Sequence, residues 1–153
     1  MDTEERGGRV YLTGSYQHNL DAKQRLTLPA SFRKQFDGVV HLVPVNGAIY
    51  GFTPEAHAEW VMSFFENGFD ARNRKHDALK RKLNARTVIV EVDNAGRIAL
   101  GKLPAAKLEQ YGISRAVTVI GNGDHFEVWN AATVDDDADD DAELDALMFD
   151  SAE

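Results

Sequence analysis

The sequence predicts a single α+β domain built from two copies of one strand-loop-strand-helix-hairpin unit. An Asp followed four residues later by an Arg that leads directly into alternating apolar residues occurs twice, in DAKQRLTL (residues 21–28) and in DNAGRIAL (residues 93–100), at an offset of 72. Each motif leads through a helical segment to two apolar strands, separated by Asn46-Gly47 in one copy and by Asn122-Gly123 in the other, at an offset of 76. Neither half of a chain of 153 residues is long enough to bury its own apolar face. We therefore expect two half-folds that complete each other about a pseudo-two-fold axis.

The first copy covers residues 14–53 and follows an N-terminal leader at residues 1–13. Its predicted elements are, in order, strands at residues 15–20 and 25–28 joined by a loop, a short amphipathic helix at 29–38, and strands at 39–43 and 48–52. Pro29 suits the first turn of a helix, where its missing N–H would have no partner. The Asn-Gly pair between the last two strands is the strongest short-range signal for a tight hairpin.

A helical insert at residues 54–85 separates the first copy from the second copy, residues 86–131. Thr53-Pro54-Glu55 combines an N-cap, a first-turn proline and an acid, so it predicts a helix that runs to about Glu66. Asp70 is expected to cap a second helix. The second copy should contain strands at residues 87–92, 97–100, 116–120 and 125–129, with a helix at 104–111.

The net charge of −8 is unevenly distributed along the chain. Residues 131–153 hold ten acidic side chains and no Lys or Arg, which leaves +2 for residues 1–130. Because blocks of like charge repel one another and rarely pack, we expect residues 132–153 to form an acidic disordered tail. A solvated tail is the favoured interpretation, although Leu144, Leu147 and Met148 could offer one apolar turn to a partner protein.

Several classes of function find no support in the composition. The absence of cysteine excludes disulfides and thiolate sites, and no apolar run approaches the roughly 20 residues that span a bilayer. The chain has no GxxxxGK[ST] or GxGxxG motif, and its five histidines lack the spacing of a metal site. An acid-base pair formed by Asp21 and Asp93 is the weakest alternative. We therefore expect no enzyme activity, no catalytic residue, no cofactor, no metal and no membrane partner.

The repeated Asp-x-x-x-Arg motif has two interpretations. In the structural one, the Asp accepts hydrogen bonds from backbone N–H groups just ahead of it, and the Arg pairs with that Asp. In the functional one, Lys23, Arg25 and Thr27 form a donor-rich face, while the intervening apolar residues supply the core. Such a face on a β-ribbon fits the DNA major groove, where Arg can bind guanine and Lys can neutralise phosphate.

The segments around these motifs are similar to the MraZ family of bacterial transcriptional regulators. The resemblance rests on SYQHNLDAKQRLTLPASFRKQF in the first copy and on VEVDNAGRIAL and AVTVIGNGDHFEVW in the second, and it covers roughly residues 14–131. It implies a pseudo-two-fold β-barrel of two swapped-hairpin, SpoVT/AbrB-like repeats with helices inserted between and beside them. It also implies a ring-shaped homo-oligomer that binds promoter-proximal direct repeats in double-stranded DNA. Such a protein would be a cytoplasmic, nucleoid-associated repressor of the division and cell-wall gene cluster, including its own gene.

The family's DNA-reading loops fall at residues 21–27 and 93–99. Arg25 and Arg97 match the motif arginines, and Lys23 matches a commonly polar or basic position. With Thr27 on the same face as Lys23 and Arg25, we expect DNA binding by Lys23, Arg25, Thr27 and Arg97, and loop structuring by Asp21, Asp93 and Gly96. We expect two related β-ribbons that present Arg25 and Arg97 on a shared outer surface, with loop one supplying most of the phosphate affinity.

The chain departs from the family pattern at two places. Gln24 stands where a glycine usually precedes the first Arg, so it would be strained if that position requires positive φ. After Leu100, the residues Gly101-Lys102-Leu103-Pro104 replace the expected Pro-Pro, so the second helix should start late.

Two alternatives to the DNA-reading loops remain. The basic segment at residues 72–86 is a rival DNA surface, although a solvated helix or an oligomer contact is the favoured interpretation. The second alternative is a protein-interaction module of the antitoxin type, which would grip a partner through its acidic tail and bind DNA weakly. A further hypothesis is that the tail competes with DNA for the basic loops.

Overall fold

Eight strands and six α-helices make up the part of the chain that the computed structural model describes, residues 9–135 and 141–149. The strands are β1 (Ser15–Asn19), β2 (Arg25–Thr27), β3 (Val39–Val45), β4 (Ala48–Phe52), β5 (Val88–Glu91), β6 (Arg97–Ala99), β7 (Ala116–Gly121) and β8 (Phe126–Asn130). The helices are α2 (Ala30–Arg33), α3 (Pro54–Met62), α4 (Arg74–Ala85), α5 (Ala105–Gln110), α6 (Ala131–Asp135) and α7 (Asp141–Phe149), with a 3-10 turn η1 at Leu100–Lys102. The predicted α+β class and the two sets of strands are confirmed.

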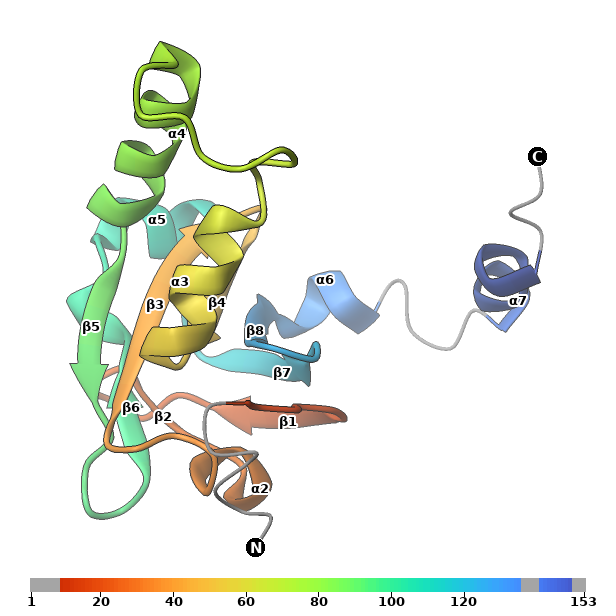
Figure 1. Ribbon diagram of the computed structural model, residues 1–153. Coiled ribbons are helices and arrows are strands. Elements are labelled where there is room, and N and C mark those ends of the chain that lie inside the picture. The colour runs from red at the N-terminus through yellow and green to blue at the C-terminus, as the bar shows by residue number, and fades with distance from the viewer. Residues whose placement is uncertain (1–8, 136–140, 150–153) are drawn as a thin grey trace, which may run out of the picture.

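The strands form one six-stranded antiparallel sheet, in the order β1-β7-β8-β4-β3-β5, and a separate two-stranded ribbon of β2 and β6 (Figure 1). Pairing crosses between the two sequence copies. The first strand of copy one, β1, pairs with β7 of copy two, and the first strand of copy two, β5, pairs with β3 of copy one. We expected two ribbons, one from each copy. This expectation was wrong, because β2 and β6 pair with each other and form a single ribbon.

Reciprocal hydrogen bonds relate the two copies by a pseudo-two-fold axis. The backbone N–H of Leu20 donates to the carbonyl of Arg115 (2.8 Å), and the equivalent N–H of Val92 donates to that of Gly38 (2.8 Å). Arg115 is therefore the structural equivalent of Gly38. The offset of 76 between the two Asn-Gly pairs predicts that Ser114 is the equivalent of Gly38. The predicted offset between the two hairpins is therefore one residue smaller than the observed one.

The second hairpin turns one residue later than its Asn-Gly sequence predicts. The N–H of Asn122 donates to the carbonyl of His125 (2.8 Å), so the chain reverses at Gly123 and Asp124. The side chain of Asn122, just after β7, donates to Glu127 on β8 (2.9 Å). Gly123 is held by a backbone bridge to Leu12, whose side chain is 1% exposed, so part of the predicted leader packs into the fold.

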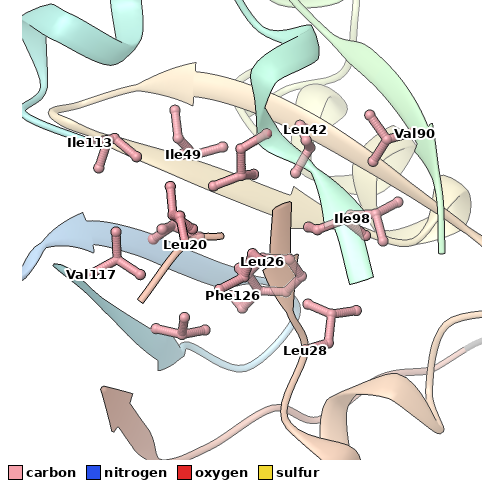
Figure 2. Close-up of a cluster of buried hydrophobic side chains, with 14 of the residues drawn as sticks. Leu20, Leu26, Leu28, Leu42, Ile49, Val90, Ile98, Ile113, Val117 and Phe126 are labelled. Atoms are coloured by element: carbon pink, nitrogen blue, oxygen red, sulfur yellow. The ribbon is translucent and has the colours of Figure 1, made fainter. Parts of the chain in front are cut away.

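The main core lies where the two copies meet (Figure 2). Leu26 and Ile98 point into it from the ribbon and are both fully buried. Phe126 packs against the rings of Phe32 and Phe36, with centroid distances of 6.0 Å and 5.6 Å. Burial of large aromatic and aliphatic side chains from both copies explains why the two halves fold together.

Helix α3 of the insert covers the other face of β3 and β4, and α4 packs against α3 (Figure 1). As predicted, Thr53 caps α3, its hydroxyl accepting from the N–H of Ala56 (3.1 Å). The expectation that Asp70 caps the next helix was wrong. Asn73 is the N-cap of α4 and accepts from two backbone N–H groups, while Asp70 stabilises the preceding turn. Both residue types cap helices well, so the sequence does not decide between them.

The described parts of the acidic tail are helical. Helix α6 packs beside β7 and β8, whereas the side chains of α7 are exposed. Residues 136–140 and 150–153 of the expected disordered tail lie outside the described residues, and disorder of the tail as a whole stays a prediction. Within the described ranges, no helix is both long and apolar enough to span a bilayer.

Candidate nucleic-acid interface

The first Asp-x-x-x-Arg loop is a closed turn organised by one carboxylate. Oδ1 of Asp21 accepts hydrogen bonds from the backbone N–H groups of Lys23 (2.9 Å) and Arg25 (2.8 Å). Oδ2 accepts from Nε of Arg25 (2.7 Å). The N–H of Gln24 donates to the carbonyl of Asp21 (2.9 Å), which closes the turn. The carboxylate therefore fixes both the loop backbone and the root of the guanidinium group.

The second loop repeats this arrangement atom for atom. Oδ1 of Asp93 accepts from the backbone N–H groups of Ala95 (2.9 Å) and Arg97 (2.8 Å), and Oδ2 accepts from Nε of Arg97 (2.9 Å). The structural interpretation of both Asp residues is thus correct in its geometry. It does not exclude the functional one, because each Asp uses only one of the three nitrogens in the guanidinium group of its Arg.

Backbone hydrogen bonding also lowers the pKa of both carboxyl groups. For Asp21, the largest cause is the hydrogen bond from the N–H of Arg25, which outweighs the opposing effect of partial desolvation. The pKa of Asp93 is lowered in the same way by the N–H of Arg97. Both groups are therefore ionised throughout the neutral range, and the turns keep their organising charge.

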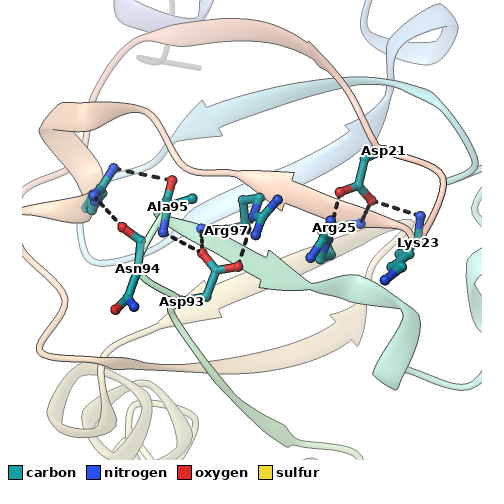
Figure 3. Close-up of polar contacts among 8 residues, drawn as sticks. Asp21, Lys23, Arg25, Asp93, Asn94, Ala95 and Arg97 are labelled. Atoms are coloured by element: carbon teal, nitrogen blue, oxygen red, sulfur yellow. Dashed lines mark hydrogen bonds and ion pairs between the residues drawn. The ribbon is translucent and has the colours of Figure 1, made fainter.

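The ribbon places the two arginines on one solvent-facing surface (Figure 3). In the β2–β6 register, Arg25 lies opposite Ala99 and Arg97 lies opposite Thr27. These four positions share one face, since the alternating residues between them point into the core. The side chains of Arg25 and Arg97 are 30% and 34% exposed. Lys23 lies in the exposed part of the first loop and Thr27 at the exposed end of β2.

Each Asp holds the guanidinium group of its Arg through Nε alone. Across residues 9–135 and 141–149, the terminal amino groups Nη1 and Nη2 of Arg25 and Arg97 make no hydrogen bond. A guanidinium group with a fixed root and two open terminal donors can bind a planar pair of acceptors. The chemistry open to this surface is therefore recognition of a base edge or a phosphate group.

The loops differ in net charge and in backbone strain. Loop one carries Asp21, Lys23 and Arg25, a net +1, whereas the charges of Asp93 and Arg97 cancel in loop two. Gln24 has φ 61°, at the position where Gly96 has φ 80°. The position thus requires positive φ, and the expected strain at Gln24 follows. The second helix, α5, starts late as predicted, because η1 precedes it.

Sequence reasoning missed Arg33, a third arginine near this surface. It lies at the end of α2 in copy one, yet its guanidinium group reaches the backbone of the second loop. Its position in a short helix of one copy gave no sequence signal for a contact with the other copy.

A polar cluster lies away from the ribbon, in the turn before β8 and on β8 itself. The ring of His125 is held between Asp124 (2.7 Å) and Glu127 (2.8 Å), and Glu127 also accepts from Nε1 of Trp129 (2.9 Å). Burial by itself would lower the pKa of His125, but the two carboxylates raise it above its ordinary value. Both ring nitrogens of His125 and both carboxylate oxygens of Glu127 have hydrogen-bond partners within the cluster.

Comparisons with known proteins point to one family. A family model described as "MraZ protein, putative antitoxin-like" matches residues 11–74. The chain is 32% identical over 118 residues to the "Transcriptional regulator MraZ" of Mycoplasmoides gallisepticum, covering 76% of this chain and 80% of that protein. It is 32% identical over 146 residues to the protein of the same name from Mycoplasmopsis pulmonis, covering 90% of this chain and 92% of that protein. The similarity thus extends through both loops and the insert between them.

Proposed function

Because the chain belongs to the MraZ family, we propose that it is a sequence-specific DNA-binding transcriptional regulator that reads repeated boxes through its two Asp-x-x-x-Arg loops. The observation that carries this proposal is the pair of anchored arginines on one outward face, each with two open terminal donors. A two-stranded ribbon is narrow enough to enter the major groove, where each base pair presents its own pattern of donors and acceptors.

The arginines would read guanine. Nη1 and Nη2 of Arg25 can donate together to O6 and N7 of one guanine, while Asp21 keeps Nε and so restricts rotation of the guanidinium group. Less side-chain entropy is then lost on binding. Arg97 acts in the same way from the other end of the ribbon, and Thr27 beside it offers a hydroxyl group.

Lys23 would neutralise phosphate. Its backbone N–H donates to Asp21, but its exposed ammonium group is not part of the turn. Copy two has Ala95 at the equivalent position and so lacks this charge. Loop one therefore supplies more of the sequence-independent affinity than loop two.

Assembly would be part of the mechanism. The loops of one chain carry only a small net charge, so one chain alone would bind DNA weakly. A ring-shaped homo-oligomer that places several ribbons on direct repeats would multiply these weak contacts through avidity. On this proposal the protein acts in the cytoplasm at the nucleoid, as a repressor of the division and cell-wall gene cluster that includes its own gene.

The crossed strand pairing supports the finer fold proposal. Strands β1 and β5 each pair with a strand of the other copy, as expected for two swapped-hairpin, AbrB-like repeats closed into a barrel. In this organisation residues 14–53 and 86–131 are the repeats, residues 54–85 are an insert and residues 132–153 are a tail.

The proposal is tested by the mobility shift of the gene's own upstream DNA. Wild-type protein should shift this DNA at ~150 mM salt, and Arg25→Ala and Arg97→Ala should each weaken the shift. Arg81→Ala is a matched control, because Arg81 is an exposed arginine paired with Asp77 on the rival basic helix α4. If Arg81→Ala weakened binding more than the loop variants did, the basic helix would be the DNA surface.

The exposed apolar side of α7 favours a second candidate function, binding of a partner protein as in antitoxins. Leu144, Leu147 and Met148 are 53%, 70% and 57% exposed. Comparing the full chain with a chain lacking residues 132–153 separates the two functions. A DNA complex that survives this deletion and depends on Arg25 supports the regulator, while partner capture that requires the tail and no DNA shift supports the antitoxin type.

A further inference from the structure

Arg33 bridges the two copies at the second loop. Its Nη1 lies 3.4 Å from the carbonyl oxygen of Ala95 and its Nη2 lies 3.4 Å from that of Asn94. Both distances are long for hydrogen bonds, so the contact is mainly attraction between the guanidinium charge and two carbonyl dipoles. The peptide groups that Arg33 faces are therefore held from the side opposite Asp93, which binds the N–H of Ala95.

Gly96 makes this approach possible. It is buried, and a Cβ atom there would lie 2.7 Å from both Cδ and Cζ of Arg33 and closer still to Nη1. Any other residue would displace the guanidinium group. The glycine thus serves two purposes, since it also has positive φ.

Loop one is held differently. The residue equivalent to Gly96 is Gln24, and its side chain packs beside Gly101 in η1. A Cβ atom built at Gly101 would lie 3.1 Å from Oε1 of Gln24. Helix α5 has Glu109 after its buried Leu108, whereas α2 has Arg33 after its buried Phe32. At the position equivalent to Arg33, α5 therefore offers the first loop a carboxylate and no guanidinium group.

We propose that Arg33 is a positioning residue for Arg97: by clamping the carbonyls of Asn94 and Ala95 it fixes the second loop, and so sets the base preference that Arg97 contributes. The inference rests on the proposed DNA-reading function of that loop. Arg33 acts through the loop backbone and needs no contact with DNA. One copy thereby positions the reading residue of the other, which couples the two halves of the ribbon.

The clamp itself is tested without DNA, by amide hydrogen exchange of Arg33→Ala. Exchange at residues 95–97 should rise about five-fold, which corresponds to about 1 kcal/mol of local stability, while residues 23–25 of loop one stay unchanged. Lys34→Ala is the control, since Lys34 is the next cation along the chain and is exposed. Gly96→Gln, which copies Gln24, should displace Arg33 and give the same result. Unchanged exchange at residues 95–97 in Arg33→Ala would overturn the clamp.

The effect on reading is tested by a double-mutant cycle on cognate and scrambled DNA. Arg33→Ala should relax preference at the base position that Arg97→Ala relaxes, and the double variant should bind no worse than Arg97→Ala alone. Additive losses, or equal losses on both DNAs, would identify Arg33 as an independent phosphate contact and overturn the positioning role. If Arg25→Ala and Arg97→Ala left DNA binding intact, the proposed function would fail, while the exchange experiment would still decide the clamp.

Discussion

Leu26 and Ile98 lie directly opposite each other in the β2–β6 ribbon, and each is the other's equivalent in the sequence repeat. The pseudo-two-fold axis therefore passes between them. As a consequence, Arg25 and Arg97 are diagonal neighbours on the opposite, solvent-facing side, with backbone positions roughly 7–8 Å apart. Two equivalent buried residues thus set the spacing of two equivalent exposed ones.

The Asp turns should resist acid. A carboxyl group with a lowered folded pKa stabilises the fold above its unfolded pKa, and this contribution is lost as pH falls through the folded pKa. Since the pKa values of Asp21 and Asp93 lie below the ordinary 3.8, both turns should stay intact on acidification until below that pH. A carboxyl titration by NMR should give both midpoints under 3.8. Midpoints at or above this value would contradict the hydrogen bonding described for the loops.

The buried His125–Glu127 pair should make stability fall at alkaline pH. A histidine with a raised folded pKa contributes stability that is fully present below its unfolded pKa of 6.5 and is lost as pH rises through the folded pKa. Glu127→Gln should lower the free energy of unfolding by about 1.5–3 kcal/mol near pH 6, because it removes a charged partner of the imidazolium. Urea denaturation measures this loss.

Asp124→Asn provides the control for that prediction. Asp124 is 53% exposed whereas Glu127 is 10% exposed, so its loss should cost less stability. Equal stability of Glu127→Gln and wild type across the pH range would show that the cluster carries no charge on His125.

Gly51 should be intolerant of any side chain. A Cβ atom there would lie 2.6 Å and 2.7 Å from Cε2 and Cε1 of Phe126, which is fully buried and cannot move aside. We expect Gly51→Ala to destabilise the fold by about 1–3 kcal/mol through overpacking, as measured by urea denaturation. Gly101→Ala should cost clearly less, because its tightest contact would be with the flexible end of Gln24, at 3.1 Å. Equal costs would argue against the close approach of β4 and β8.

Removing the acidic tail should tighten DNA binding. Residues 131–153 hold ten acidic side chains, which would compete with phosphate for Lys23, Arg25 and Arg97. Deleting residues 132–153 should therefore raise affinity, most clearly at low salt, where screening is weak. A titration of DNA at two ionic strengths measures the difference. The same affinity with and without the tail would remove this role.

Local features of the fold could be predicted from the sequence, because local spacing determines them. The Asp-to-Arg spacing predicted the turn, and alternation around Leu26 predicted which side faces the core. The strain at Gln24 could be expected because a glycine usually stands at that position in the family, and its φ of 61° bears this out. In each case neighbouring residues decide the local conformation.

Features that depend on distant residues could not be predicted. Pairing of β2 with β6 joins strands from opposite copies, and neither strand's sequence identifies its partner. The second turn moved to Gly123 because Leu12 bridges to it from the N-terminal segment. The contact of Arg33 with the second loop depends on how α2 packs, so spacing along the chain gave no sign of it.

The specificity of Arg25→Ala tests the central claim most directly. Affinity for an upstream box and for a scrambled box should be measured at one fixed salt concentration, with Lys23→Ala alongside. We predict that Arg25→Ala loses about 1–3 kcal/mol on the upstream box and far less on the scrambled one, whereas Lys23→Ala weakens both alike and lowers the salt slope by roughly one unit. Equal losses on both boxes for Arg25→Ala would contradict the account of Arg25 as a reader of bases.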